Sequence, residues 1–168
     1  MARPRSNEKR LKIPPPLEIA WFAGLVDGEG SIQIQPAKPS KTARNKRTVY
    51  RLSLSVGMTH YPTLVFIRDM WGIGALCPAP LKAPHGRKPY WIWSAKSNDA
   101  LKILELCYPY QKTKRAEAEI AIYFQKARNA RSIFWGGYIR NIPDSELDKD
   151  KDLMLKLKES RTVSDLLK

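Results

Sequence analysis

The order of apolar and polar positions predicts two strands that form a long hairpin near the start of the chain. Residues 31–35 and 49–59 both alternate with a period of two, which is typical of strands with one buried face. The inward positions are apolar: Ile32, Ile34, Leu52, Leu54 and Val56. The outward positions are polar or small: Ser31, Gln33, Gln35, Arg51, Ser53, Ser55 and Gly57.

Further along, the pattern predicts a second pair of strands and four helices. The strands are expected near residues 73–80 and 89–95, and the helices over residues 17–26, 62–71, 98–107 and 114–130. Gly72 and Gly74 are expected to stop the second helix. The first seven of these elements follow the order α-β-β-α-β-β-α, which predicts one α+β domain with an antiparallel four-stranded sheet.

The ends of the chain differ from this domain in composition. Residues 1–13 are expected to be a basic arm, ended by a run of three prolines, and residues 14–140 to form the domain. Residues 141–168 are expected to be a charged extension, in which residues 147–158 can form one more helix before a weakly ordered end.

Charge changes the picture, because it points to a partner. The chain has 30 Lys and Arg against 16 Asp and Glu, a formal net charge of +14. Such an excess favours a polyanion, with nucleic acid as the first choice and an anionic membrane surface as the second. Residues 36–51 contain six basic and no acidic side chains: Lys38, Lys41, Arg44, Lys46, Arg47 and Arg51. We interpret this segment as a loop that wraps a phosphate backbone, with a solvated loop without a partner as the alternative.

The sequence argues against several other classes of protein. Apolar stretches are too short to cross a bilayer, and the basic amino terminus leads to no apolar segment with a cleavage site. We therefore expect an intracellular protein, located with the DNA of its host genome or organelle. Cys77 and Cys107 lack metal-site spacing and are expected to be buried, reduced thiols.

The end of the first helix breaks local rules in a way that indicates chemistry. Asp27 and Glu29 lie where the helix dipole disfavours negative charge. A divalent cation would reverse that preference, because helix-terminal carbonyls and a carboxylate together form a hard oxygen site for Mg²⁺. Gly28 and Gly30 would let the backbone approach a ligand. The alternative is an ordinary glycine cap with two solvated acids.

These residues, Phe22-Ala23-Gly24-Leu25-Val26-Asp27-Gly28-Glu29-Gly30, resemble the LAGLIDADG motif of the homing endonucleases. The resemblance extends in element order over about residues 17–130. It implies that Glu29 is the catalytic, metal-binding carboxylate, with the Gly28 carbonyl as a further ligand. The departure is Glu in place of the commoner Asp.

One motif per chain implies a homodimer, because cutting both strands of a duplex requires two attacks of opposite polarity. Small residues one turn apart on the first helix would let two copies approach closely. On the resemblance, the dimer interface contains Ala20, Ala23, Gly24 and Asp27.

The resemblance also implies that the sheet reads base edges in the major groove. Gln33 and Gln35 could pair with adenine, Arg51 with guanine, and Ser53 and Ser55 with either base. The alternative for the two serines is a solvent-exposed sheet face that binds no partner. Trp91 and Trp93 share one face of the fourth strand, and the period does not decide which face. On the resemblance, the second hairpin is expected to add DNA contacts through Lys82, Arg87, Lys88 and Trp91.

Two further residues are assigned catalytic roles by the resemblance. The segment before the last long helix, residues 109–118, is similar to the family's and makes Lys114 the active-site lysine, with Lys112 as its rival. His60 falls where the family often has a polar residue that orders water. By composition alone, solvated lysines and a surface histidine are the alternatives.

The resemblance implies a site-specific DNA endonuclease that depends on Mg²⁺, leaves short 3′ overhangs and promotes the mobility of its intron or intein. Mn²⁺ is expected to substitute, and Ca²⁺ to support binding without cleavage. The alternatives are a maturase that binds intron RNA and a cleavage-inactive DNA-binding regulator. An intact Glu29 with Lys114 in register favours the nuclease over the regulator.

Overall fold

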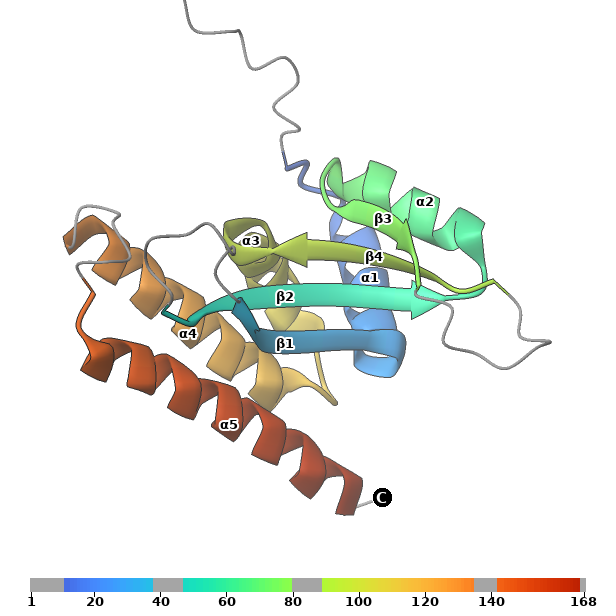
Figure 1. Ribbon diagram of the computed structural model, residues 1–168. Coiled ribbons are helices and arrows are strands. Elements are labelled where there is room, and N and C mark those ends of the chain that lie inside the picture. The colour runs from blue at the N-terminus through green and yellow to red at the C-terminus, as the bar shows by residue number, and fades with distance from the viewer. Residues whose placement is uncertain (1–10, 38–46, 80–88, 135–141, 167–168) are drawn as a thin grey trace, which may run out of the picture.

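The computed structural model describes residues 11–37, 47–79, 89–134 and 142–166, without the side chains of residues 132–134 and 162–166. Two layers make up the fold, a four-stranded sheet and a set of helices (Figure 1). The helices are α1 (Pro16–Glu29), α2 (Tyr61–Trp71), α3 (Ser97–Cys107), α4 (Arg115–Phe134) and α5 (Asp144–Leu166). A short 3-10 turn, η1 (Tyr108–Tyr110), joins α3 to the approach of α4.

The sheet contains β1 (Gly30–Ala37), β2 (Val49–Met58), β3 (Ala75–Pro78) and β4 (Trp91–Lys96) in the order β1-β2-β4-β3. All three pairings are antiparallel. The predicted α+β class, with the order α-β-β-α-β-β-α over the first seven elements, is confirmed.

The core lies between the sheet and the helices, and the predicted inward positions of the first hairpin fill it. The side chains of Ile32, Ile34, Leu52, Leu54 and Val56 are all buried there. In Figure 1, α1 and α3 lie behind the sheet and leave its opposite face uncovered near β2. A hairpin with one apolar and one polar face therefore has its polar face available for a ligand.

Local sequence explains where α2 ends and the second hairpin begins. Gly72 (φ 68°) and Gly74 (φ 96°) follow α2 in left-handed backbone conformations, as the predicted stop requires. A Cβ at Gly74 would collide with the indole of Trp93, whose Nε1 donates to the Ile73 carbonyl at 3.2 Å. The turn thus packs directly against the indole of Trp93, which is buried in the core.

Near both ends of the chain, described residues pack against the domain more closely than expected. Lys12 was assigned to the basic arm, but its backbone N–H donates to the Trp71 carbonyl at 2.9 Å. The carboxyl-terminal helix was expected over residues 147–158 with a weakly ordered end, whereas α5 continues to Leu166 and packs along α4 and β1. Leu157 of α5 is buried in the same core as the sheet. The extension is therefore part of the packed domain.

The structure also corrects the expectation for one cysteine. Cys107 is buried as expected, but Cys77 is exposed on the edge strand β3. Among the described residues, no helix has both the length and the apolar character needed to cross a membrane.

Candidate active site and nucleic-acid interface

The motif helix α1 ends three residues later than expected, so that Asp27, Gly28 and Glu29 form its last turn. Phe22 and Val26 are buried in the core and orient the helix against the sheet. Gly28 and Glu29 are exposed. Packing of one face of α1 therefore presents its final turn at the surface, where the backbone carbonyls of a helix end need partners from outside the helix.

Asp27 is held by the backbone that leads into α4. Its carboxylate accepts hydrogen bonds from the backbone N–H groups of Lys112 at 2.7 Å, Thr113 at 3.1 Å and Lys114 at 3.0 Å. The amino-terminal end of a helix attracts negative charge, so α4 compensates the unfavourable dipole of α1. The position of Asp27 against the dipole rule is thus explained by structure, without a metal.

Lys114 makes the opposite contact. Its ammonium donates to the backbone carbonyls of Val26 at 2.9 Å and Asp27 at 2.8 Å, at the carboxyl-terminal end of α1 where a cation is favoured. The structure therefore brings Lys114 to the motif, 87 positions away in sequence from Asp27. Lys112, its rival, is exposed and contacts the motif only through its backbone.

Glu29 is the acid that these contacts leave unexplained. It is exposed, and its side chain has no hydrogen bond or ion pair within the described ranges. No cluster of three or more His, Cys, Asp or Glu side chains is found among the described residues. Because Lys114 occupies the carbonyls of Val26 and Asp27, one chain offers the Glu29 carboxylate and the carbonyl of Gly28, a hard-oxygen donor set that fits Mg²⁺ but supplies only part of its six-coordinate shell.

His60 lies at the same end of the sheet. Gly30 pairs with Val56 across the first hairpin, and His60 follows directly after that strand as the residue before α2. Its Nδ1 is 2.8 Å from the Thr63 hydroxyl, so the ring is held at the start of α2 and remains exposed. This contact is sufficient to explain the position of the ring.

The uncovered face of the first hairpin carries the predicted base-reading residues in rows. Gln33 lies opposite Ser53, Gln35 opposite Arg51, and Ser31 opposite Ser55. Along β1, Gln33 Nε2 donates to the Ser31 hydroxyl at 2.7 Å, and Gln35 donates to the side-chain oxygen of Gln33. These amides therefore share one face and are already oriented by each other.

β4 extends this polar face with two residues that the sequence analysis missed. Lys96 pairs with Ser53, and Ser94 pairs with Ser55, so both continue the rows across the sheet. Trp93 and Ala95 point the other way and are buried. The alternation of residues 92–96 predicted that Ser94 and Lys96 share one face of the strand. Only the pairing with β2 shows that this face is the polar one.

The structure corrects the expectation for Trp91. It shares the face of buried Trp93, on the helix side of the sheet, and its ring packs 4.7 Å from that of Tyr61 in α2. Trp91 is therefore a packing residue of the second hairpin and does not lie on the polar face.

Of the expected phosphate contacts, two are described. Arg51 is exposed beside Gln35 at the start of β2. Arg47 is bound to the protein itself, because its Nη1 donates to the Ile142 carbonyl at 2.6 Å and its Nε to Asp144 at 3.0 Å. The other basic residues of both hairpin loops lie outside the described residues: Lys38, Lys41, Arg44, Lys46, Lys82, Arg87 and Lys88.

The outer face of α1 is apolar and exposed. Leu17 is 83% exposed, and Trp21 packs edge-on against Phe66 of α2 with both rings partly exposed. Gly24 continues this face, and a Cβ there would meet nothing within 4 Å. Ala20 is half-buried, whereas Ala23 is buried in the chain's own core, which corrects its expected place in a dimer contact.

Comparison with known proteins identifies the fold. No protein-family model matches the sequence, and no curated protein matches it. The fold is similar to that of the homing endonuclease I-CvuI in complex with its target, with a TM-score of 0.57 and 22% identity over 89% of this chain and 96% of that one. The archaeal intron-encoded homing endonuclease I-Vdi141I, complexed with DNA, matches with a TM-score of 0.63 and 13% identity over 86% of this chain and 84% of that one.

A third similar structure is the meganuclease I-SmaMI bound to DNA, with a TM-score of 0.59 and 17% identity. This match covers 92% of the present chain but only 47% of I-SmaMI. The protein therefore has the fold of the homing endonucleases. The fold that the LAGLIDADG resemblance implied is thereby confirmed.

Proposed function

We propose that the protein is a LAGLIDADG homing endonuclease that cuts a specific duplex DNA site as a homodimer. The observation that carries this proposal is the contact of Lys114 with the end of α1, the helix whose last residue is the exposed Glu29. Two segments far apart in sequence thus bring a cation to the helix end that carries Glu29, a carboxylate without a hydrogen bond or ion pair among the described residues. Such a pair suits an attack on a phosphodiester.

The polar sheet face supports DNA as the substrate. It offers amide, hydroxyl and cationic side chains in register across three strands, around the buried Ser53: Gln33, Gln35, Arg51, Ser55, Ser94 and Lys96. An antiparallel sheet with such a face suits the donor and acceptor pattern of the major groove, and the excess of +14 charges supports binding to the phosphate backbone. The similar structures of I-CvuI and I-Vdi141I are complexes with DNA.

The exposed face of α1 supports the dimer. Leu17, Trp21 and Gly24 form an apolar stripe that a second copy would cover, with Phe66 at its flank. The chain matches nearly the full length of I-CvuI but about half of I-SmaMI. That relation suits a chain that supplies one of two equivalent halves.

For catalysis, Glu29 and the Gly28 carbonyl of each copy would hold Mg²⁺ near the dimer axis. The metal would activate water and stabilise the charge that develops at the phosphate. Lys114 would stabilise the same charge from the side, and the approach to α4 would keep Asp27 in place. Two such centres would cut the two strands at staggered phosphates, leaving short 3′ overhangs and promoting intron or intein mobility.

The test begins with capture of random duplex DNA by the purified protein in Ca²⁺, followed by addition of Mg²⁺ and sequencing of the cut ends. A recovered near-palindrome of about two helical turns, cut on both strands near its centre, is expected. Glu29→Gln should abolish cleavage and leave capture intact. A failure to enrich any duplex, with binding of structured RNA in a parallel selection, would overturn the proposal in favour of a maturase, and capture without cleavage would favour a regulator.

A further inference from the structure

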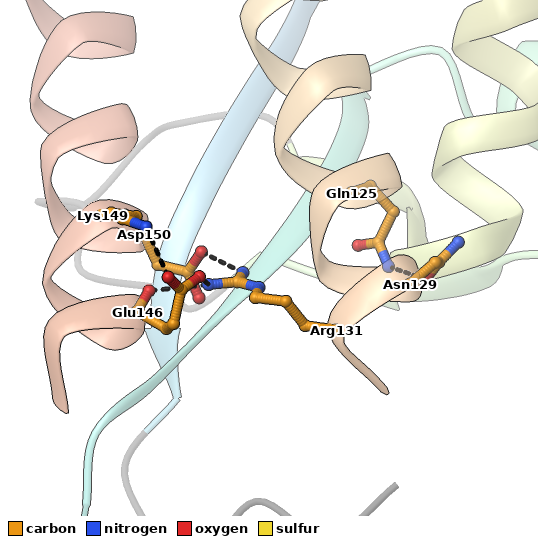
Figure 2. Close-up of polar contacts among 6 residues, drawn as sticks. All are labelled: Gln125, Asn129, Arg131, Glu146, Lys149 and Asp150. Carbon is orange, nitrogen blue, oxygen red and sulfur yellow. Dashed lines mark hydrogen bonds and ion pairs between the residues drawn. The ribbon is translucent and has the colours of Figure 1, made fainter. Parts of the chain in front are cut away.

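Helix α5 is attached to the DNA-binding hairpin and to α4 at three places along its length. Near its start, Asp144 binds Arg47. Within the next two turns, Glu146 and Asp150 bind Arg131 of α4, which also donates to the Glu146 carbonyl at 2.6 Å (Figure 2). Near its far end, Leu157 enters the core and Arg161 binds the Ile32 carbonyl of β1.

The middle attachment is the most protected of the three. The side chains of Arg131 and Asp150 are 14% and 5% exposed. Burial raises the pKa of Asp150 above its ordinary value, while the hydrogen bond and charge of Arg131 act in the opposite direction. Removing one partner would leave the other charge buried, so this contact fixes α5 against α4.

The far attachment covers the edge of the sheet. β1 is an edge strand, and a free edge exposes backbone groups that need partners. Arg161 binds one of these, the carbonyl of Ile32, and lies 3.7 Å from Glu117 of α4. The strand that carries Gln33 and Gln35 is therefore supported from the side by α5.

The first attachment reaches the base of the basic loop. Arg47 lies two residues before β2 and closes the segment that begins after β1. Its side chain is only 26% exposed while that of Asp144 is 84% exposed, so the guanidinium turns toward the protein. Both the carboxylate of Asp144 and the carbonyl of Ile142 accept its hydrogen bonds.

We propose that Arg47 and Asp144 form a tether by which α5 fixes the loop end of the β1–β2 hairpin, so that Arg47 is a positioning residue for target recognition and not a phosphate contact. This inference rests on the proposed DNA-binding function. It assigns the carboxyl-terminal helix a role in sequence discrimination, because a hairpin held at both its edge strand and its loop end presents its side chains in one register.

The two roles of Arg47 predict opposite effects for its acidic partner. If Arg47 contacts phosphate, Asp144 competes with DNA, and Asp144→Asn should strengthen binding. If Arg47 is a tether, losing either partner releases the hairpin. Asp148 provides a matched control, because it is an exposed acid on the same helix without a hydrogen bond or ion pair within the described residues.

The experiment measures binding of the selected target and of scrambled duplex in Ca²⁺, over a range of salt, for Arg47→Ala, Asp144→Asn, their combination, Asp148→Asn and the exchange Arg47→Asp with Asp144→Arg. A tether predicts that each single variant weakens target binding about threefold or more relative to scrambled DNA. The combination should be no worse than either single variant, the exchange should recover most of the loss, and Asp148→Asn should retain full discrimination.

A phosphate contact predicts a different set of results and would overturn the proposal. Arg47→Ala would then weaken both duplexes equally and reduce the salt slope by about one, and the exchange would not restore binding. Limited proteolysis of the free protein gives a readout without DNA, in which both single variants should expose α5 to cleavage faster than Asp148→Asn does. If the wild type bound no duplex, the proposed function would fail; unchanged proteolysis in a protein that does bind would overturn the tether alone.

Discussion

Asp27 and Lys114 cap each other's helices. The Lys114 backbone N–H donates to the Asp27 carboxylate at 3.0 Å, and the Lys114 ammonium donates to the Asp27 carbonyl at 2.8 Å. The end of α1 and the start of α4 are thereby joined through one pair of residues, with each charge at the helix end that favours it. The proposed catalytic Glu29 follows immediately, so its position depends on this pair.

The first prediction concerns the three hydrogen bonds of the Asp27 carboxylate. Asp27→Ala should lower the free energy of unfolding by about 1–3 kcal/mol, because three backbone N–H groups lose a charged acceptor. Chemical denaturation measures the change. Glu29→Gln is the matched control, since its exposed side chain has no partner within the described part of the chain, and it should change stability by less than about 0.5 kcal/mol.

Substitution of the two candidate lysines, Lys114 and Lys112, should have different effects on stability as well as on activity. Lys114→Met removes an ammonium from the end of α1. It should lower the free energy of unfolding by about 1–2 kcal/mol and abolish cleavage. Lys112→Met keeps the backbone N–H that binds Asp27 and should leave both nearly unchanged. Equal losses of cleavage in the two variants, with equal stability, would contradict the assignment of Lys114.

Gly24 offers a clean test of the proposed dimer. Because a Cβ at this position meets nothing within 4 Å among the described residues, Gly24→Leu should preserve the fold, and a loss of the dimer would come from the contact between the two copies. Sedimentation should show the wild type at twice 19.2 kDa and the variant at 19.2 kDa, with the same circular dichroism spectrum. A variant that stays dimeric would refute the packing of two α1 helices through this face.

The two cysteines should differ in reactivity and in their effect on alkaline stability. Cys77 is exposed and should react with a thiol reagent at pH 8, whereas Cys107 should react only on unfolding, because burial raises its pKa from 9.0 to about 12. Between these values the folded state keeps a proton that the unfolded state releases, so stability should fall as pH rises from 9 toward 12. Chemical denaturation at pH 8 and pH 10 measures this loss of stability, and the loss should be smaller in Cys107→Ala, which lacks the thiol.

How much the sequence predicts varies with the range of the interaction. The first hairpin was predictable in detail, because Ile32, Leu52 and Val56 alternate with polar residues and strand alternation is a local property. The face of the fourth strand was not. Both of its faces carry apolar side chains, and only the pairing of Trp93 with Val56 shows that Trp91 belongs to the helix side.

The candidate site, too, was predictable from the sequence only in part. Resemblance pointed to Glu29, Gly28 and Lys114, but reasoning from the dipole made Asp27 and Glu29 look equally anomalous. The structure distinguishes them, because the amino-terminal end of α4 lies against Asp27 and not against Glu29. No spacing within the α1 segment could have revealed a partner more than eighty positions away.

The sequence by itself determined the period of each element, the end of α2 at glycine, the excess of positive charge and the identity of the motif. These follow from the shape, the polarity and the backbone freedom of neighbouring residues. Only the tertiary structure decided that α5 belongs to the core, that Arg47 binds Asp144 and that Lys96 joins the polar face. Such contacts join segments distant in sequence, and their partners are selected by packing and charge in three dimensions, which no local pattern encodes.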